Sequence, residues 1–336
     1  MFSSSADKAC QARAIVIGKR KYWVFRILRS ETMKLGIYGL GRMGANMARR
    51  LSRGGIEVVA HNRSTAPIDE LVAEETHITG AYTLNEFVDA LPSPRIVWLM
   101  LPSGNVTEEA ISQVLPLLDE GDLLIDGGNS FYQDTIARAA RVQKSGVHYM
   151  DVGTSGGVWG LKNGYSLMFG GSDEAATLIT PAIKVLAPAA DRGWGHVGPV
   201  GSGHFVKMVH NGIEYGMMQA LAEGLDLLRA KKAFDLDLAQ ITELWRDGSV
   251  VQSWLLDLTA EALAEQGQGL EHIAPVVSDS GEGRWTAKEA IDLGVSAPVM
   301  TLALQMRFAS QDAEGYGNRL LSLMRNAFGG HAITKK

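Results

Sequence analysis

Four polar side chains stand at helical spacing in one apolar stretch of the chain. Lys207, His210, Asn211 and Glu214 follow an i, i+3/i+4, i+7 pattern, so a helix would place them on one face. A lysine can act as a base, a glutamic acid can return a proton, and His and Asn can donate hydrogen bonds. The same spacing is typical of the solvated face of an amphipathic helix, so spacing alone leaves both interpretations open.

A glycine-rich turn gives a second chemical signal. Residues 39–44 fit G-x-G-x-x-G and lie between a predicted strand and a predicted helix. The first glycine permits a tight turn, the second lets a pyrophosphate approach, and the third lets the helix pack closely. The helix N-terminus then faces the negative charge. The turn predicts a dinucleotide cofactor, bound by Gly39, Leu40, Gly41, Arg42, Met43 and Gly44.

The end of the following strand bears on the choice of cofactor. An NAD-preferring site usually has Asp or Glu here for the ribose hydroxyls, but this chain has Asn62, Arg63 and Ser64. An acid would repel a 2′-phosphate, whereas these residues would accept it. We predict NADP as the favoured cofactor and NAD as the alternative. A solvated arginine at an ordinary strand end would give the same residues.

Two polar loops follow predicted strands and are further candidates for the site. The loop after Asp151 contains Ser155, Gly156 and Gly157, whose backbone N–H groups would suit an anion or a hydroxyl. By itself it is also compatible with a plain turn. The loop 126–130, which contains Asn129, ends a strand at the edge where open α/β sheets bind ligands.

The elements that must position these residues follow from hydrophobic periodicity. Short apolar runs alternate with helical patterns, which predicts an α/β fold with a Rossmann-type, doubly wound parallel sheet. After Gly201 the pattern is helical, with a long helix over 201–230 and further helical patterns over 236–265 and 298–327, so an all-α helical domain follows. The predicted strands are Leu35–Tyr38, Ile56–Ala60, Ile96–Met100, Leu123–Ile125, His148–Asp151, Ser166–Phe169 and Gly193–Val197.

The predicted domains are an extension over 1–32, an NAD(P)-binding Rossmann-like domain over 33–198, a helical domain over 199–330 and a tail over 331–336. The extension is basic and contains Ser, as an organellar transit segment would, but Met33 stands directly before the first strong strand. We therefore interpret residues 1–32 as a disordered or non-native extension.

Composition excludes several classes of protein. The 336 residues carry 32 Lys plus Arg and 37 Asp plus Glu, and a net charge of −5 argues against non-specific nucleic-acid binding. Cys10 is the single cysteine, so an internal disulfide and a multi-cysteine zinc site are excluded. The His, Asp and Glu spacings predict no metal site. No apolar run approaches the roughly 18 residues of a membrane span, so we expect no membrane contact and a cytoplasmic location.

These segments together resemble the 6-phosphogluconate dehydrogenase family, the decarboxylating enzymes of the pentose phosphate pathway. The resemblance runs from Met33 to His331, and the length is similar to the short form, which has one helical unit instead of a duplicated one. Related β-hydroxyacid dehydrogenases share the glycine turn, the Ser-Gly-Gly loop and the helix lysine. They are not expected to combine these with the motifs of residues 207–215, 281–286 and 325–331. That combination favours a site over a solvated stripe. The resemblance is carried by residues 39–44, 101–103, 126–130, 155–157, 207–215, 245–249, 281–286 and 325–331.

The resemblance implies a reaction and residue roles. 6-Phosphogluconate would be oxidised at C3 and decarboxylated to ribulose 5-phosphate, with reduction of NADP or NAD, in gluconate utilization or the pentose phosphate pathway. Lys207 would take the 3-hydroxyl proton and Glu214 would protonate C1 of the enediol. The cofactor would also contact Leu101, Pro102 and Asn129. The substrate would be held by Ser155, Gly156, Gly157, His210 and Asn211 at its carboxylate and hydroxyls, and by Tyr215, Arg284, Thr286 and Arg307 at its phosphate.

The resemblance also implies self-association. Arg325 and His331 reach a neighbouring subunit's site in this family, so we expect a homodimer or homotetramer in which the helical domain contributes the substrate site and the oligomer interface. One departure is informative. Residues 281–286 are Gly-Glu-Gly-Arg-Trp-Thr where long-form enzymes usually have Gly-Thr-Gly-Lys-Trp-Thr. Arg284 keeps the positive charge and adds a bidentate fork for phosphate, whereas Glu282 has no assigned role.

Two other functions fit part of the pattern. A 3-hydroxyisobutyrate-type dehydrogenase would oxidise a small β-hydroxyacid and would not need the phosphate cluster of Arg284, Thr286, Arg307 and Arg325. A catalytically silent NADP-binding protein would need neither Lys207 nor Glu214, because binding alone requires no proton transfer.

Overall fold

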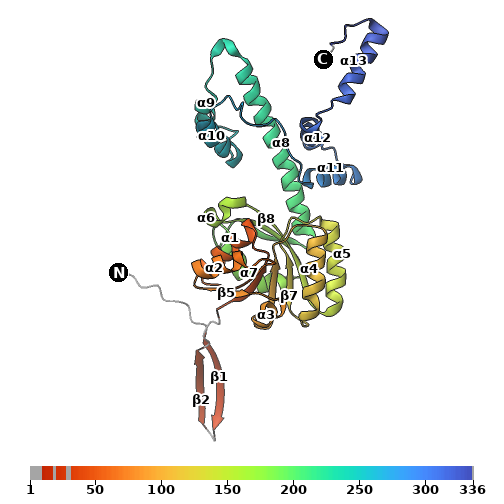
Figure 1. The fold of residues 1–336 in the computed structure, drawn as a ribbon. Helices are drawn as coiled ribbons and strands as arrows, with labels where there is room; N and C mark the ends of the chain where they lie inside the picture. The colour runs from red at the N-terminus through yellow and green to blue at the C-terminus, as the bar shows by residue number, and fades with distance from the viewer. Residues whose placement is uncertain (1–9, 18–19, 28–31, 335–336) are drawn as a thin grey trace. The chain divides into compact units, whose positions relative to one another are not determined.

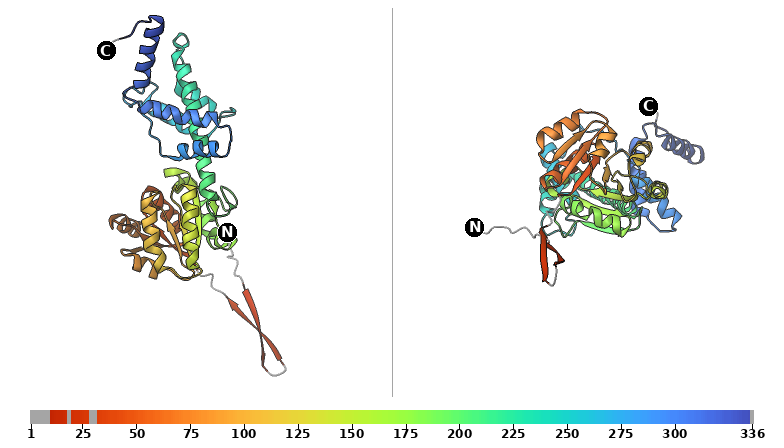
Figure 2. Two further views of the ribbon diagram at one scale, coloured as in Figure 1. Left: turned by 90° about the vertical axis from the view of Figure 1, so that its right-hand side faces the viewer. Right: turned by 90° about the horizontal axis from the view of Figure 1, so that it is seen from below.

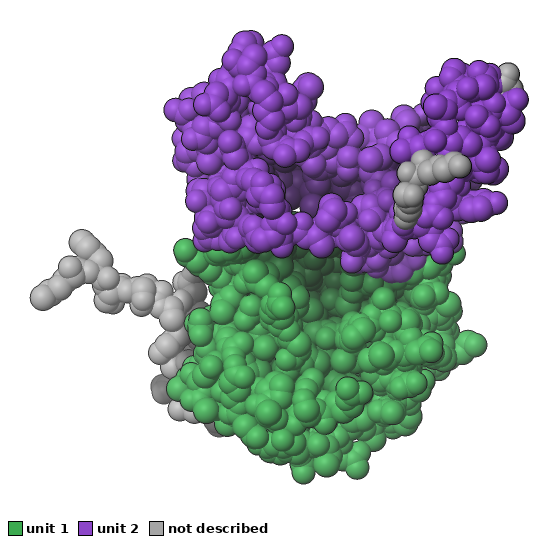
Figure 3. Space-filling model, turned by 45° about the horizontal axis from the view of Figure 1, so that its top comes forward, with its two compact units in different colours: residues 1–207 green, residues 208–336 purple. Residues whose placement is uncertain are grey.

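The computed structural model describes residues 10–17, 20–27 and 32–334. The chain divides into two compact units, Met1–Lys207 and Met208–Lys336, coloured separately in Figure 3, and each is described by itself. The predicted extension over 1–32 and tail over 331–336 fall partly outside the described residues and stay predictions. In the described part of the predicted extension, β1 (Cys10–Ile17) and β2 (Arg20–Ile27) pair antiparallel, whereas we expected no strands there. Their β-branched and aromatic residues favour strand structure.

In the described residues, the first unit is built on an eight-stranded sheet with the order β10-β9-β8-β7-β6-β3-β4-β5. The predicted Rossmann-type α/β fold is confirmed, but β8 and β9 pair antiparallel within an otherwise parallel sheet. The connection between them, residues 156–165, is too short for a parallel crossover. The strands are β3 (Lys34–Tyr38), β4 (Glu57–His61), β5 (Ile78–Ala81), β6 (Ile96–Leu99), β7 (Leu123–Asp126), β8 (His148–Ser155), β9 (Ser166–Gly170) and β10 (Trp194–Gly198).

Helices cover both faces of this sheet (Figures 1 and 2). Successive residues of a strand alternate between two buried clusters: Ile96 and Trp98 belong to one, Val97 and Leu99 to the other. Helices α1, α2 and α7 contribute to the first cluster, and α3, α4 and α5 to the second. The helices of this unit are α1 (Arg42–Arg53), α2 (Ala66–Glu74), α3 (Leu84–Asp89), α4 (Asn105–Val114), α5 (Tyr132–Val142), α6 (Gly160–Asn163) and α7 (Asp173–Leu186).

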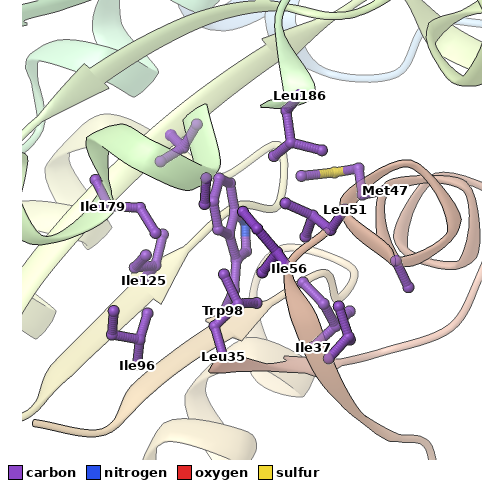
Figure 4. Packing of buried hydrophobic residues seen from close by; sticks show 14 of the residues in the cluster. Leu35, Ile37, Met47, Leu51, Ile56, Ile96, Trp98, Ile125, Ile179 and Leu186 are labelled. Atoms are coloured by element: carbon purple, nitrogen blue, oxygen red, sulfur yellow. The ribbon is translucent and has the colours of Figure 1, made fainter. Parts of the chain in front are cut away.

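The Trp98 side chain stands at the centre of the first cluster and is fully buried. Leu35, Ile56 and Ile125 approach it from the sheet side and Ile179 from α7, as Figure 4 shows. Burying each large apolar side chain stabilises the fold by about 1.5–3 kcal/mol. The cluster therefore gives the strands a rigid base, and their carboxyl ends carry the loops of the candidate site.

The second unit is helical. Helix α8 (Ser202–Ala230) begins in the first unit and continues into the second. The helical patterns over 236–265 and 298–327 are each divided in two, because Gly248 and Gly315 adopt positive φ angles of 73° and 59°, which interrupt a helix. The remaining helices are α9 (Leu238–Trp245), α10 (Trp254–Gln266), α11 (Glu282–Asp292), α12 (Pro298–Gln311) and α13 (Tyr316–Gly329).

Candidate active site

The glycine-rich turn joins β3 to α1 and has the shape that a pyrophosphate requires. Gly39 has φ +105°, and a Cβ there would lie 2.5 Å from the Met100 carbonyl oxygen. A Cβ at Gly44 would lie 1.9 Å from the Gly39 carbonyl oxygen, so the helix start packs against the turn. At Gly41, in contrast, a Cβ would meet nothing within 4 Å. Gly41 therefore leaves open space beside the backbone, where a ligand can approach.

The start of α1 is prepared for negative charge. Its N-cap is Gly41, no side chain caps it, and no acidic residue stands in its first turn. The N–H groups of Arg42, Met43 and Gly44 belong to this first turn, whose donors have no partner within a helix. Their alignment favours an anion. A hollow of about 230 Å³ beside the turn is lined by Leu40, Gly41, Arg42, Ala45, Asn46, Arg49, Pro67 and Glu70.

The end of β4 is tied to this turn by Asn62. Its Oδ1 accepts the Leu40 N–H at 3.0 Å, and its Nδ2 donates to the Ser64 hydroxyl at 2.9 Å. Arg63 and Ser64 are exposed. The Asn62 amide thus shapes the loop, whereas the Arg63 side chain is left exposed.

Other predicted cofactor residues end neighbouring strands. Leu101 follows β6, and its Cδ2 would be 2.8 Å from a Cβ on Gly39. Pro102 is exposed, and its carbonyl accepts the Thr107 hydroxyl at 2.8 Å. Asn129 is exposed after β7. The carboxyl ends of β3, β4, β6 and β7 therefore present the predicted cofactor residues along one edge of the sheet.

The Ser155 loop leaves the sheet at the end of β8. Ser155 and Gly156 are half-buried and Gly157 is exposed. Gly156 and Gly157 have φ angles of +127° and +51°, conformations that glycine adopts without strain. The chain reverses here before the antiparallel strand β9.

The start of α8 is fastened to β8 by Asp151. This carboxylate is fully buried; its Oδ1 accepts the Gly201 N–H at 2.6 Å and its Oδ2 accepts the His204 N–H at 2.7 Å. Burial raises the pKa of Asp151, and the nearby His204 and the two N–H donors oppose that rise. A Cβ on Gly153 would lie 2.4 Å from the Lys207 Cβ, so β8 and the first turns of α8 are in close contact.

The predicted proton-transfer residues all lie in α8. Lys207 is buried, with 8% of its surface exposed. The His210 Nδ1 lies 3.1 Å from the Asn211 Oδ1 and 3.9 Å from the Glu214 Oε2. Both His210 and Glu214 have side chains that are 41% exposed. The arrangement combines a buried amine with a solvent-accessible acid, seven residues apart on one helix.

In the second unit, Asp279 contacts two of the predicted phosphate residues, and a third lies on the ring of one of these two. Asp279 accepts the Arg284 Nε–H and, at 3.3 Å, the Tyr215 hydroxyl. The Arg307 guanidinium carbon lies 3.5 Å from the centre of the Tyr215 ring, and its Nη1 donates to the Ser278 carbonyl at 2.9 Å. We call Tyr215, Ser278, Asp279, Arg284 and Arg307 the Asp279 cluster.

Thr286 and the C-terminal residues stand apart from the Asp279 cluster's hydrogen bonds. The Thr286 hydroxyl is buried and lies 2.9 Å from both the Met208 and the Glu282 carbonyl oxygens. Arg325 is exposed on α13, and His331 is exposed just beyond it, with its carbonyl accepting the Asn326 amide at 2.8 Å.

Sequence reasoning missed Asp279 and Ser280, although a signal was present. An aspartate two residues before a glycine is typical of a turn in which its side chain accepts a backbone N–H, and Asp279 accepts that of Gly281 at 3.1 Å. Among the described residues, no group of three or more His, Cys, Asp or Glu side chains is arranged to hold a metal. No described helix is both long and apolar enough to cross a bilayer.

The fold and this site define an NAD(P)-binding oxidoreductase with a helical second domain. Residues 34–196 match the family model described as the NAD binding domain of 6-phosphogluconate dehydrogenase, and residues 203–323 match that of its C-terminal domain. The chain belongs to the 6-phosphogluconate dehydrogenase family, whose members are oxidoreductases acting on CH–OH groups.

Two curated relatives differ in cofactor. An NAD⁺-dependent, decarboxylating 6-phosphogluconate dehydrogenase of Haloferax volcanii is 38% identical over 90% of this chain and 99% of its own length. An NADP⁺-dependent, decarboxylating one of Bacillus subtilis is 37% identical over 82% of this chain and 61% of its own length. The chain thus spans nearly all of the first relative and about three fifths of the second.

Two solved structures are similar in fold. Plasmodium falciparum 6-phosphogluconate dehydrogenase, determined alone and with NADP⁺ or 6-phosphogluconate, has a TM-score of 0.76 and 30% identity, covering 90% of this chain and 66% of that one. A 3-hydroxyisobutyrate dehydrogenase of Salmonella typhimurium has a TM-score of 0.68 at 20% identity, covering 84% of this chain and 95% of that one. The second likeness concerns the fold alone.

Proposed function

We propose that the protein oxidises and decarboxylates 6-phospho-D-gluconate to D-ribulose 5-phosphate and CO₂ with reduction of NADP, or of NAD. The observation that carries this proposal is the buried Lys207 next to the β8 end, with Glu214 two turns further along the same helix. Binding a nicotinamide cofactor alone would need neither group. The names of the relatives support the same reaction.

In the oxidation step, Lys207 removes the proton of the substrate's 3-hydroxyl. Lys207 is buried beside β8, and an amine acts as a general base in its unprotonated form. A bound nicotinamide cofactor would supply the acceptor for the hydride of C3. Gly41 leaves room for its pyrophosphate, and the first turn of α1 offers the N–H groups.

In the second step, the 3-keto acid loses CO₂. A β-keto acid can do so without a metal, provided that its keto oxygen is polarised, and the Lys207 that has just taken a proton supplies that charge. Glu214 then protonates C1 of the resulting enediol. Its 41% exposed side chain can exchange protons with solvent between turnovers.

Substrate positioning is shared among the polar groups of both loops and helices. We assign the carboxylate and hydroxyls to Ser155, Gly156, Gly157, His210 and Asn211, and the phosphate to Tyr215, Arg284, Thr286 and Arg307. The Asp279 cluster supports the second assignment because it brings Tyr215 and both arginines together. Thr286 would have to turn its hydroxyl from the carbonyl oxygens that it now meets.

For the cofactor, we propose a preference for NADP that rests on Arg63. The side-chain amide of Asn62 is hydrogen-bonded to Leu40 and Ser64. The exposed Arg63 is therefore the group that would meet a 2′-phosphate. No acid stands at residues 61–65 to compete for it.

We also propose that the active form is a homodimer or homotetramer in which the tail of one copy enters the site of the next. Asp279 pairs with Arg284 and offsets part of the positive charge that a phosphate would meet. Arg325 from a second copy would add positive charge, and His331 would add a further hydrogen-bonding group. Exposed apolar side chains on α12 and α13 offer it a surface: Val299, Leu302, Met306, Tyr316, Leu320, Leu321, Leu323 and Met324.

The test is a mixture of the purified protein with 6-phosphogluconate, with NADP and NAD in parallel, in which nicotinamide reduction and released CO₂ are both measured. We expect reduction with one CO₂ per reduced nicotinamide and a faster rate with NADP. Reduction without CO₂, or no reduction by folded, oligomeric protein, would refute the proposed reaction.

A further inference from the structure

The side chain of Asp279 is nearly completely buried, and its hydrogen-bond partners are groups that the proposed reaction needs. Its side chain is 4% exposed, whereas that of its partner Arg284 is 54% exposed. Oδ1 accepts the Tyr215 hydroxyl at 3.3 Å and the Gly281 N–H at 3.1 Å, and Oδ2 accepts the Arg284 Nε–H. One carboxylate therefore links three elements: α8, the turn before α11, and the first turn of α11 itself.

The hydrogen bond to Arg284 leaves most of the guanidinium free for another anion. The Nε–H is engaged by Asp279, while the guanidinium carbon lies 4.4 Å from the centre of the Phe308 ring. A guanidinium held at Nε and stacked on a ring has its plane fixed, with the Nη groups directed away from its anchor. Such an arrangement presents a preformed fork to a phosphate.

Arg307 is fixed in a similar way through Tyr215. Its guanidinium lies flat enough to bring the central carbon within 3.5 Å of the ring centre, and Nη1 donates to the Ser278 carbonyl. The Tyr215 ring is in turn oriented by its hydroxyl, which meets Asp279 and, at 3.3 Å, the Ser280 Oγ. Ser280 donates to the buried Glu282 carboxylate. Asp279 thus acts on both arginines, directly on one and through the tyrosine on the other.

The negative charge of Asp279 distinguishes this role from direct attraction of the substrate phosphate. A carboxylate near a phosphate would by itself repel it, so Asp279 can favour phosphate binding only by orienting the cations. Burial raises the pKa of Asp279, but Arg284 and the Gly281 N–H outweigh this effect and hold the pKa below its ordinary value. The carboxylate is therefore ionised under ordinary conditions.

We propose that Asp279 is a positioning residue for the phosphate end of the substrate: it orients Arg284 and Tyr215, and through Tyr215 also Arg307, before the substrate binds. This inference rests on the proposed function, since it concerns the same substrate. It predicts that loss of the Asp279 charge weakens phosphate recognition, although removal of a negative charge alone would strengthen it.

The test is the Asp279→Asn variant of the full-length protein. We expect KM for 6-phosphogluconate to rise about tenfold, the typical effect of losing one charge-assisted hydrogen bond. The KM for the cofactor and kcat should change by less than about twofold. Inhibition by inorganic phosphate, competing with 6-phosphogluconate, should weaken in parallel. The matched control is Asp226→Asn, which breaks the exposed Asp226–Arg229 pair in the same unit and should leave all four quantities unchanged.

A double-mutant cycle separates positioning from a general structural effect. If Asp279 acts mainly through Arg284, the double variant Asp279→Asn with Arg284→Gln should raise KM for 6-phosphogluconate little more than Arg284→Gln alone. Additive increases, an unchanged KM or a lower KM would each overturn the inference. If Asp279→Asn does not fold, Asp279→Glu keeps the charge but displaces it by one methylene group; an unchanged KM for that variant would overturn the inference as well.

Failure of the Asp279 inference can be distinguished from failure of the proposed reaction. If the unmodified protein turns over no 6-phosphogluconate, the proposed reaction fails, and the affinities of the unmodified and Asp279→Asn proteins for 6-phosphogluconate and inorganic phosphate are then compared by calorimetry. Weaker binding by the variant supports the positioning role, and equal or tighter binding overturns it.

Discussion

Lys207 is the residue on which the proposed chemistry depends most directly. Replacing it with Met keeps much of its apolar stem and removes the amine, so we expect kcat to fall by about 10²–10⁴-fold, the usual contribution of a general base. Cofactor affinity, measured by fluorescence of the bound reduced nicotinamide, should stay within about twofold. Lys231→Met, at an exposed position, is the control. A turnover that survives the Lys207 change would show that Lys207 is not the general base.

At the same scale, the proposed preference for NADP depends on Arg63. In Arg63→Ala we expect kcat/KM for NADP to fall about tenfold or more, because a 2′-phosphate loses its charge-assisted partner, while the value for NAD changes little. Initial rates with both cofactors measure the ratio, and Arg192→Ala, another exposed arginine of the first unit, provides the reference. An equal loss for both cofactors would show that Arg63 does not discriminate between them.

The residues of the site differ in how far sequence could predict them. The glycine turn could be predicted because each of its three glycines is required by a different feature of the backbone. In the structure, a side chain at Gly39 or Gly44 would collide with backbone atoms, whereas Gly41 faces open space. The roles assigned to Lys207, Glu214 and the phosphate residues stay predictions. The Asp-x-Gly spacing indicates a turn at Asp279 but not its contact with Tyr215, which lies 64 positions away, because tertiary contacts of that kind leave no local periodicity.

At the scale of elements, Asp151 holds the start of α8. Asp151→Ala would leave the N–H groups of Gly201 and His204 buried without their acceptors, and we expect the free energy of unfolding to fall by about 3 kcal/mol. Asp151→Asn keeps one acceptor oxygen and should recover part of this loss. Urea unfolding measures both variants, with the exposed Asp191→Ala as control. A loss below about 1 kcal/mol in Asp151→Ala would contradict the role.

Helices α4 and α5 are joined by ion pairs between Glu108 and two arginines, and acid weakens these pairs. The Arg141 guanidinium, followed by that of Arg138 and opposed by partial burial, holds the pKa of Glu108 below its ordinary value of 4.5. A depressed carboxyl pKa stabilises the fold fully above the unfolded value, and this stability is lost as pH falls through the folded value. We therefore expect the stability of Glu108→Gln to vary less with pH below about 4.5 than that of the unmodified protein. Identical pH profiles from pH 6 to 3 would argue against these pairs.

Most elements of the sheet could be predicted, and the exceptions have physical causes. The strands β3, β4, β6 and β7 are runs of apolar residues buried on both faces, which periodicity detects readily. Strand β5 was missed because Ile78-Thr79-Gly80-Ala81 is short and only partly buried at the sheet edge. The antiparallel β8–β9 pair was missed because strand direction depends on the connecting segment and not on the strands themselves.

At the scale of the whole molecule, the proposed self-association places the end of the chain in the chemistry. Removal of residues 325–336 should lower kcat/KM for 6-phosphogluconate by at least about tenfold, because Arg325 and His331 are lost together. Removal of 332–336 alone keeps both residues and should leave activity nearly unchanged. Steady-state rates test this prediction, and light scattering shows whether the assembly has changed as well. Full activity after the longer deletion would refute a catalytic contribution from the tail.

The glycines of the turn constrain this gene in two different ways. A mutation that replaces Gly44 with alanine puts a methyl group where the backbone already lies. The protein should then fail to fold and be lost from the cell. The same change at Gly41 meets no atom of the chain and should leave a well-folded protein that has lost only its cofactor. The first change would therefore appear as an absent protein and the second as a present but inactive one. The proposed self-association would let the inactive protein join active copies and reduce their output.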